Sequence, residues 1–363
     1  MNYQHKPLHV KIPVPNGTYE VTLTVTAHED ITLTILSQSR RFMVQDTKMS
    51  KNEKKDFVFN VSVCDYHKKD EEFTSVDSIE LDILCDGRLT AVAAVSPVNI
   101  PTIYIAGDST VTDQPAAYPY YPSNTYCGWG QMFPRLLNTG ITVENHAQSG
   151  SNTMDFMNVN FNAFKDKIKE GDFIIVEFGH NDQKVEELDA FGGYSKNLRY
   201  FVDFARSKGA TPIVASPINR IIFNNDGTLL NLLGDYRNAV KAVCEEMNVP
   251  FLDLWTRTTE FFEAAGPVKA WDYFWSNGKE RDYTHTNDIG GDIVSRFAAD
   301  EIIKNNIEPI ASLIKKDMIK VTMPEHDTLA ADENSKELEH LKSIGLVNVP
   351  ILEIDRDITK DLP

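Results

Sequence analysis

The chain has 363 residues, 42% of them hydrophobic, and carries a formal net charge of −17 at pH 7. This length is sufficient for a large buried core and for two domains. The negative charge disfavours nucleic acid and anionic membrane surfaces as partners, and no apolar run approaches the roughly 18 residues that cross a bilayer.

The first residues of the chain lack the basic start and the hydrophobic segment of a secretory signal. A cytoplasmic location is therefore expected, unless a signal peptide was trimmed and the protein is secreted or periplasmic. The four cysteines show neither CxxC pairing nor metal-ligand spacing, which fits a reduced compartment and buried apolar packing. One bridge between Cys64 and Cys85 is the alternative, because both lie in expected strands.

Residues 1–99 are expected to form an accessory β-domain. Short alternating or β-branched runs recur between turn-forming or charged clusters, at residues 10–12, 19–26, 31–36, 57–63, 78–84 and 90–95. Such regular short strands are typical of a β-sandwich or jelly roll. No His, Asp, Ser or Cys side chains cluster here, so we expect this domain to support the remainder of the chain without supplying a catalytic group.

From about residue 100 the pattern changes to strand, loop and helix. Strands are expected at residues 103–106, 141–145, 173–178, 211–215 and 250–252, and helices at 129–137, 161–169, 195–207, 236–247, 254–264 and 287–305. This alternation predicts an α/β domain with a mostly parallel sheet covered by helices on both faces. We assign residues 100–320 to this domain and the acidic, weakly periodic residues 321–363 to a C-terminal extension.

The main chemical signal is Ser109, which follows the apolar run 103–106 in the sequence Gly107-Asp-Ser-Thr110. Open α/β sheets place reactive groups at the carboxyl ends of their strands, and a sharp strand-to-helix turn exposes a serine hydroxyl. The tetrapeptide alone is an ordinary turn composition. We expect Asp108 to hold this turn through its side chain rather than to react.

Polar groups after other expected strands, and a polar segment before the last expected helix, complete a set for nucleophilic acyl transfer. This reaction needs a nucleophile, a base, a group that orients the base, and oxyanion donors. His285 is the candidate base, and Asp282, three residues earlier, is placed to fix the imidazole tautomer. The candidate oxyanion donors are the backbone N–H of Ser109, the backbone N–H of Gly150 and the side-chain amide of Asn181.

These residues occur in four ordered blocks that resemble the SGNH (GDSL) hydrolases: Gly107-Asp-Ser-Thr110, Gly150, Gly179-His-Asn-Asp182 and Asp282-Tyr-Thr-His285. Residues 106–113, 128–130, 178–184 and 282–287 are most similar to rhamnogalacturonan acetylesterases. The resemblance covers about residues 100–310 and implies a flavodoxin-like three-layer fold, a serine esterase, and neither cofactor nor metal. Residues 1–99 resemble the accessory sandwich that precedes the hydrolase domain in some members.

The resemblance also implies an acetylated pectic oligosaccharide or polysaccharide as substrate, and galacturonate in it is anionic like the protein. Long-range attraction cannot assist such binding, so local cations must meet the carboxylates. The candidates are Lys184 and Arg220, with Lys279 and Arg281 also near the expected strand ends. Trp271 and Trp275 are candidates for stacking on sugar rings, with anchoring of a loop in the core as the equal alternative.

Two other functions remain open from the sequence. A lipase or thioesterase of the same superfamily would need an apolar acyl channel, which the polar and aromatic surroundings of the motifs disfavour. A non-catalytic carbohydrate-binding protein would not need Ser109, Asn181, Asp282 and His285 together. No oligomeric state is indicated.

Overall fold

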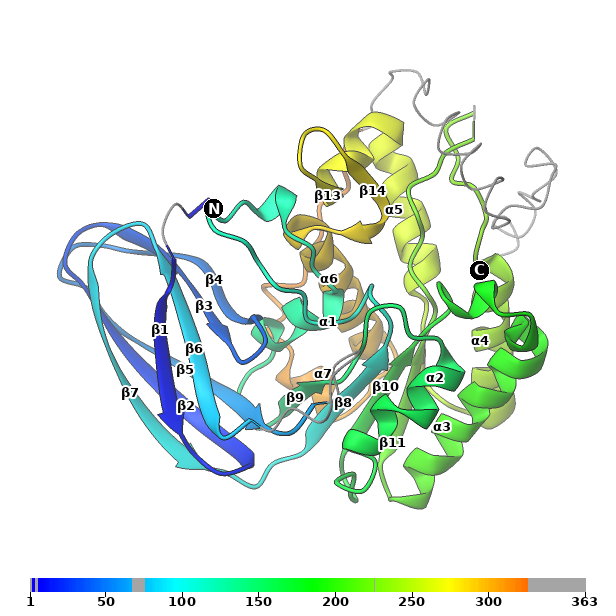
Figure 1. Ribbon diagram of the computed structural model, residues 1–363, viewed down its shortest axis with the longest axis horizontal. Helices are drawn as coiled ribbons and strands as arrows, with labels where there is room; N and C mark the ends of the chain where they lie inside the picture. Colours follow the sequence, from blue (N-terminus) through cyan, green and yellow to red (C-terminus); the bar gives the residue numbers. More distant parts are fainter. Residues whose placement is uncertain (1, 4–5, 67–75, 225, 326–363) are drawn as a thin grey trace.

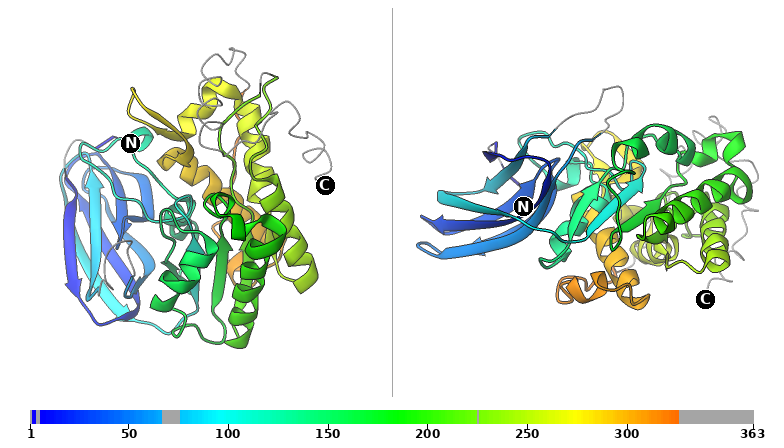
Figure 2. Two further views of the ribbon diagram at one scale, coloured as in Figure 1. Left: turned by 45° about the vertical axis from the view of Figure 1, so that its right-hand side comes forward. Right: turned by 90° about the horizontal axis from the view of Figure 1, so that it is seen from below.

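The computed structural model describes residues 2–3, 6–66, 76–224 and 226–325. Two antiparallel sheets are followed by a five-stranded parallel sheet with helices, and Figures 1 and 2 show these two regions side by side. Most of the expected C-terminal extension lies outside the described residues. Within the described ranges, no helix is both long enough and apolar enough to cross a membrane.

The N-terminal strands form what we call the two-sheet region. They are β1 (Leu8–Pro13), β2 (Gly17–Ala27), β3 (Ile31–Ser37), β4 (Arg41–Met49), β5 (Lys54–Val63), β6 (Ser78–Cys85) and β7 (Leu89–Pro97). One sheet has the order β1-β6-β3-β4 and the other the order β5-β2-β7. Alternate residues of β2, including Val21 and Leu23, are buried and share one apolar cluster with Leu33 and Ile83 of the facing sheet.

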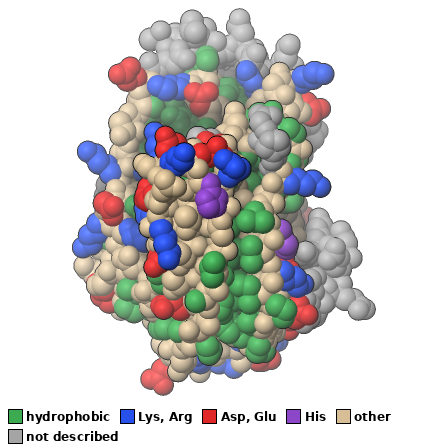
Figure 3. Space-filling view, turned by 90° about the vertical axis from the view of Figure 1, so that its left-hand side faces the viewer, with side chains coloured by type: hydrophobic (Ala, Val, Ile, Leu, Met, Phe, Trp, Pro, Cys, Tyr) green, Lys and Arg blue, Asp and Glu red, His purple; other side chains and the backbone are tan. Residues whose placement is uncertain are grey.

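The outward side of the two-sheet region is mixed in character. Figure 3 shows charged side chains scattered over this side, with hydrophobic side chains gathered in one strip. Val58 of β5 and Val92 of β7 are 47% and 64% exposed. Strand β4 has no counterpart among the strands expected from the sequence, because Arg41 and the charged second half of the strand obscure the apolar pattern.

The parallel sheet determines where the polar loops meet. Its strands are β8 (Thr102–Gly107), β9 (Thr142–Asn145), β10 (Phe173–Glu177), β11 (Thr211–Ala215) and β12 (Phe251–Leu252). They pair in the order β12-β11-β10-β8-β9, and every pairing is parallel. Counted along the chain this is the 2-1-3-4-5 order of flavodoxin-like folds, whose switch point lies between the first and third strands, here β8 and β10.

Helices cover both faces of this sheet, as expected. Successive residues of a strand point to opposite faces, so Ile103 and Ile105 pack with α1 (Trp129–Met132), α5 (Leu254–Lys269) and α6 (Asp288–Lys304). Tyr104 and Ala106 pack instead with α2 (Thr153–Asn158), α3 (Ser195–Ser207) and α4 (Gly234–Met247). The three layers are therefore helices, sheet and helices (Figure 1).

The helix expected at residues 161–169 is wrong. Residues Asn160–Ala163 form one 3₁₀ turn, and Phe164 leaves the helical region with φ −135° and ψ −15°. Phe161, Phe164 and Ile168 have helical spacing because all three are buried against the same side of the sheet, although turns rather than a helix place them there. Apolar periodicity over so short a segment does not distinguish the two.

Candidate active site

The loops that carry the predicted site residues meet at the carboxyl ends of the central strands. Ser109 follows β8, Gly150 lies beyond β9, and Asn181 follows β10. Asp282 and His285 lie on β14 (Arg281–Thr286), which pairs with β13 (Phe274–Ser276) and leads directly into α6. This hairpin was not among the strands expected from the sequence.

The turn that carries Ser109 is held by the side chain of Asp108 and by the start of α1. The Oδ1 atom of Asp108 accepts hydrogen bonds from the backbone N–H of Thr110 (2.9 Å) and from its hydroxyl (2.8 Å). The backbone N–H of Trp129 donates to the Thr110 carbonyl at 3.0 Å. A Cβ atom at Gly128 would lie 2.3 Å from the backbone of Val111, so only glycine lets α1 approach the turn this closely.

Ser109, His285 and Asp282 form a continuous chain of hydrogen bonds. The Oγ atom of Ser109 lies 2.7 Å from Nε2 of His285, and Nδ1 of His285 lies 2.7 Å from Oδ2 of Asp282. Asp282 Oδ1 accepts from the backbone N–H groups of Thr284 (2.8 Å) and His285 (3.0 Å). Burial opposes ionisation of Asp282, but these hydrogen bonds and the imidazole charge outweigh it and lower its pKa.

Tyr126 was not anticipated as part of this site. Its hydroxyl donates to Oδ2 of Asp282 at 3.4 Å. Its ring lies nearly perpendicular to the His285 ring, with 5.8 Å between the ring centres, and stacks on Trp275, with 4.7 Å between the ring centres. Burial, followed by the Asp282 charge, raises the pKa of Tyr126 to about 12, so its hydroxyl remains a donor. The sequence signal that could have indicated Tyr126 is its position two residues before Gly128, which begins one of the segments that resemble the esterase family.

The candidate oxyanion donors lie around Ser109. Gly150 is exposed and adopts φ +80°, a conformation that favours glycine. Within the described chain, no acceptor takes the backbone N–H of Ser109 or of Gly150. The Asn181 amide donates to the Ser151 carbonyl at 3.1 Å and accepts from Lys184 at 3.0 Å, which aims the side chain and leaves a second N–H for a ligand.

Two buried carboxyl groups lie beneath the nucleophile turn. Glu177 and Asp108 both contact the Thr110 hydroxyl, at 3.1 and 2.8 Å, and the indole of Trp129 donates to Glu177 at 2.5 Å. One hydroxyl proton can be donated only once, so two charged carboxylates would be poorly satisfied here. Burial, followed by the Asp108 charge, raises the pKa of Glu177 to about 8. Glu177 is therefore a neutral acid near pH 7.

A cavity of about 530 Å³ opens above these groups. Its lining consists of Ser109, Gln114, Tyr126, Ser149, Gly150, His180, Asn181, Lys184, Arg220, Asp282, Tyr283, Thr284 and His285. Arg220 is only 4% exposed, and its Nε and Nη1 atoms have no hydrogen-bond partner among the described residues. Burial, reinforced by Arg220 and other cations, lowers the pKa of His180 and keeps it uncharged.

The other predicted substrate contacts lie outside this lining. Trp271 packs against the core cluster beneath α5 and α6, with the Arg281 guanidinium 5.1 Å from its ring centre. Trp275 reaches the site only by stacking on Tyr126. Lys279 is exposed in the turn between β13 and β14. Lys184 and Arg220 are thus the predicted cations that face the cavity.

The residues suited to a metal lie elsewhere. Within the described residues, the one such group is Cys64, Glu144 and His146, all buried at the boundary of the two regions. His146 Nε2 already contacts Glu144 at 3.0 Å, the Ser62 hydroxyl donates to the same carboxylate, and burial raises the pKa of the Cys64 thiol. All four cysteines carry free thiols, so the alternative bridge from Cys64 to Cys85 is not formed. The expected absence of metal and cofactor stays a prediction.

Comparison with known proteins identifies relatives of the α/β part. Residues 105–293 match the GDSL-like Lipase/Acylhydrolase family. The chain is 34% identical over 210 residues to the rhamnogalacturonan acetylesterase RhgT of Bacillus subtilis, covering 55% of this chain and 88% of the relative. It is 32% identical over 219 residues to the probable rhamnogalacturonan acetylesterase YesY of the same organism, covering 59% and 98%.

A solved structure extends the likeness to the N-terminal part. The crystal structure of YxiM from Bacillus subtilis matches 82% of this chain and 80% of its own chain, with a TM-score of 0.54 and 25% sequence identity. The matched share of this chain exceeds the share that the α/β part occupies, so the match includes residues of the two-sheet region.

Proposed function

Because the chain belongs to the GDSL-like lipase/acylhydrolase family and is a carboxylic ester hydrolase, we propose that it removes O-acetyl groups from carbohydrate, with pectic rhamnogalacturonan or a related acetylated oligosaccharide as substrate. The observation that carries this proposal is the hydrogen-bonded chain of Ser109, His285 and Asp282 at a polar cavity containing two cations. We assign catalysis to residues 100–320 and an accessory β-sandwich to residues 1–99. The change from antiparallel β7 to parallel β8 supports this division.

Acylation follows from the geometry of these groups. His285 accepts the proton of the Ser109 hydroxyl as Oγ attacks the acetyl carbonyl, and Asp282 stabilises the resulting imidazolium. The N–H groups of Ser109 and Gly150 and the amide of Asn181 donate to the oxyanion of the tetrahedral intermediate. His285 then protonates the sugar oxygen, which leaves with the alcohol product and leaves an acetyl group on Ser109.

Deacylation reverses the roles of the same groups. A water molecule takes the place of the sugar, His285 removes its proton, and the second tetrahedral intermediate collapses to acetate and free Ser109. No step requires a metal ion or a cofactor.

The cavity lining supports a short acyl group. Among the described residues, no aliphatic or phenylalanine side chain lines this cavity, so an octanoyl chain would lie against hydroxyl, amide and charged groups. A lipase or thioesterase needs apolar surface for its acyl chain. We therefore expect acetyl esters to be hydrolysed far faster than octanoyl esters.

Arg220 and Lys184 support an anionic sugar. Arg220 lines the cavity, and a guanidinium binds a carboxylate through two parallel hydrogen bonds. Its Nε and Nη1 atoms are buried without a partner among the described residues, so we propose that the guanidinium turns toward a carboxylate that enters the cavity. Lys184 lies on the same side, beside Asn181. A galacturonate carboxylate would supply the missing acceptors and overcome locally the unfavourable net charge of −17.

The test compares acetate release from three oligosaccharides: acetylated rhamnogalacturonan with free carboxylates, the same material with its carboxyls methyl-esterified, and acetylated xylo-oligosaccharide. The wild type should favour the free carboxylate. Arg220→Gln should lower kcat/KM about 10- to 100-fold on that substrate alone, because a hydrogen bond to a charged group contributes about 1.5–3 kcal/mol. Hydrolysis of p-nitrophenyl acetate should change little.

The matched control is Arg237→Gln. Arg237 is also a buried arginine, but it pairs with Asp253 and does not line the cavity. It should reduce stability without altering the ratio of the three rates. Equal rates on the free and methyl-esterified substrates would exclude the carboxylate contact, whereas failure of a serine-directed phosphonate to label Ser109 would exclude the esterase itself.

A further inference from the structure

The hairpin between β3 and β4 reaches from the two-sheet region into the α/β part. Its tip is tight, with φ +52° at Gln38 and +67° at Arg40. Arg40 and Arg41 are only 7% and 2% exposed, and both make polar contacts more than 70 residues further along the chain. Two charges are thus buried at the boundary, where unpaired charge would be strongly destabilising.

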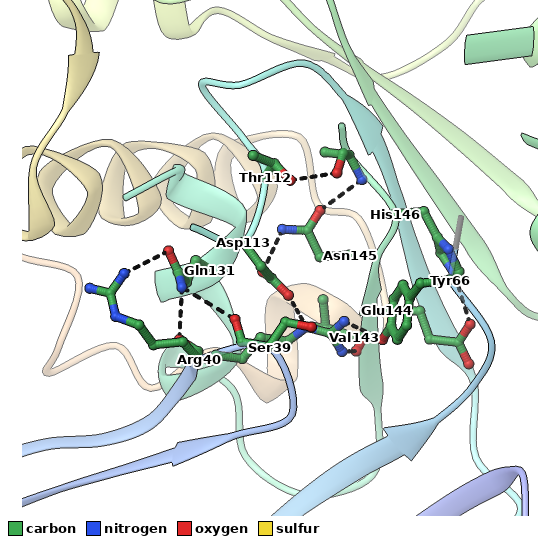
Figure 4. Close-up of polar contacts among 12 residues, drawn as sticks. Ser39, Arg40, Tyr66, Thr112, Asp113, Gln131, Val143, Glu144, Asn145 and His146 are labelled. Atoms are coloured by element: carbon green, nitrogen blue, oxygen red, sulfur yellow. Dashed lines mark hydrogen bonds and ion pairs between the residues drawn. The ribbon is translucent and has the colours of Figure 1, made fainter. Parts of the chain in front are cut away.

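Arg40 holds two residues of the cavity wall. Its Nη1 atom donates to the carbonyl oxygens of Gln114 (2.9 Å) and Tyr126 (3.0 Å), while Nη2 binds the buried carboxylate of Asp288. Gln131 strengthens the contact, since its amide donates to the carbonyl oxygens of Arg40 (2.9 Å) and Gln114 (3.0 Å). Figure 4 shows Arg40 and Gln131 meeting at this boundary.

The residues that Arg40 holds contact the candidate catalytic residues directly. The Gln114 amide donates to the Ser109 carbonyl (3.4 Å) and to the Ser149 hydroxyl (3.2 Å), beside Gly150. The Tyr126 hydroxyl donates to Asp282. The Arg40 guanidinium is therefore connected to Ser109 through Gln114 alone, and to Asp282 through Tyr126 alone.

Arg41 binds the loop after β8 and strand β9. Its Nε donates to Asp113 (2.8 Å) and its Nη1 to the Val143 carbonyl (3.0 Å). Asp113 also accepts from Asn145, and the same Asn145 amide donates to the Val111 carbonyl, both at 2.8 Å.

The loop after β9 is joined to this network. The Thr112 hydroxyl donates to the Ala147 carbonyl at 2.5 Å, and the Ala147 N–H donates to Asn145 at 3.2 Å (Figure 4). The loop after β8, which carries Ser109, and the loop after β9, which carries Gly150, are thereby locked to each other and to Arg41.

We infer that Arg40 and Arg41 are positioning residues of the active site, which rests on the function proposed above. The two-sheet region supplies two guanidinium groups that set the distance between the Ser109 turn and the oxyanion loop. Neither arginine lines the cavity. Their effect is on geometry, and misplacement of a reacting group by about 1 Å can cost about 10²-fold in rate.

The experiment uses the full chain with Arg40→Met, Arg41→Met, Arg40→Lys and Arg41→Lys. Steady-state kinetics on p-nitrophenyl acetate are measured well below the Tm of each variant, and the folded fraction is checked by circular dichroism. Each Met variant should lower kcat about 10²-fold with KM nearly unchanged. Each Lys variant should recover part of kcat, because an ammonium keeps the charge but lacks the planar fork.

Two controls separate positioning from simple attachment of the regions. Leu81→Ala removes apolar contact from the shared core of the two sheets, and Arg237→Met breaks a buried arginine–aspartate pair away from the cavity. Both should lower Tm while leaving kcat unchanged.

Wild-type kcat in the folded Met variants, or in the Lys variants where the Met variants do not fold, would overturn the inference and leave the arginines as structural contacts only. If the Met variants do not fold, the Lys variants decide alone, with about tenfold loss of kcat supporting the inference. The proposed function fails separately, through Ser109 labelling, which does not depend on either arginine.

Discussion

The two sides of the cavity differ in whether their polar groups already have partners. On one side, Ser109, His285 and Asp282 are bonded to one another within 2.7 Å at each step, and Asp282 takes three further hydrogen bonds. On the other side, the N–H groups of Ser109 and Gly150 and two donor atoms of Arg220 have no partner among the described residues.

In the proposed mechanism, this difference separates groups that act on each other from groups that act on the substrate. A base must be oriented before substrate arrives, so its hydrogen bonds are complete in the empty protein. A donor for an oxyanion or a carboxylate must remain unpaired, because a bond already made would have to be broken on binding. Substitutions on the paired side should therefore reduce the chemical step for every ester. On the unpaired side, loss of an oxyanion donor such as Asn181 should also affect every ester, whereas loss of Arg220 should affect only substrates that carry a carboxylate.

The largest expected effect is on the paired side. Ser109→Ala and His285→Ala should each lower kcat by about 10⁴- to 10⁶-fold, on acetyl esters and oligosaccharides alike, because either change removes nucleophilic attack. Steady-state kinetics on p-nitrophenyl acetate measure this, with circular dichroism as the check on folding. Retention of more than about a tenth of wild-type activity would mean that another group is the nucleophile or base.

Asp282→Asn should have the next largest effect. It leaves the shape of the site but donates where Asp282 accepts, so the imidazole loses its orientation and imidazolium stabilisation, and kcat falls by up to about 10⁴-fold. Asp272→Asn is a suitable control, because Asp272 lies in the 3₁₀ helix before β13 and does not line the cavity. A trivial loss would show that a different carboxylate orients His285.

Asn181→Ala tests the unpaired side. Loss of one oxyanion donor should cost about 10²- to 10³-fold in kcat with little change in KM, because the donor acts mainly in the transition state. Comparison of kcat and KM on one small ester is sufficient. An effect restricted to KM would make Asn181 a contact to bound substrate instead.

The smallest expected effect lies beneath the paired side, at Glu177. Burial and the Asp108 charge raise its pKa to about 8, compared with about 4.3 in an unfolded chain. The folded protein holds this proton more tightly, so the stability contribution is complete below about pH 4.3 and is lost as pH rises through about 8. Glu177→Gln, which carries no charge, should remove that decline.

Urea unfolding at pH 7 and pH 9 measures this difference. The unfolding free energy of Glu177→Gln minus that of the wild type should be larger at pH 9 than at pH 7, by about 1 kcal/mol. Glu246→Gln, at an exposed carboxylate, is the control for general pH effects. An identical difference at both pH values would show that Glu177 is already ionised at pH 7.

Much of the site could be predicted because its residues follow strands of one parallel sheet. Strand ends converge at one edge, so Ser109, Gly150 and Asn181 could be placed near each other from the sequence alone. Asp108 was correctly expected to hold its turn. Tyr126 and Gln114 could not be selected in this way, because their roles depend on how an irregular loop folds back over the sheet.

The two-sheet region was predictable as a set of strands but not as a contributor to the site. Arg40 and Arg41 lie at the tip of a hairpin whose second strand was not expected, and an arginine pair beside a turn ordinarily indicates a solvated surface. Their partners Asp113, Tyr126 and Asp288 are distant in sequence. Trp271 shows the opposite error, in which a residue expected at the site lies elsewhere. Its aromatic-rich segment is close in sequence to the candidate catalytic residues, but Trp271 packs against the core instead of facing the cavity.

The arginine contacts at the hairpin tip limit how this protein can be recombined. Exchange of its N-terminal strands for an unrelated sandwich would leave Asp113 and Asp288 buried without their cations, and an uncompensated buried charge costs about 3–5 kcal/mol. We expect a chimaera to be stable and active only when the incoming hairpin carries two arginines at its tip. An active chimaera without them would show that the regions are independent modules.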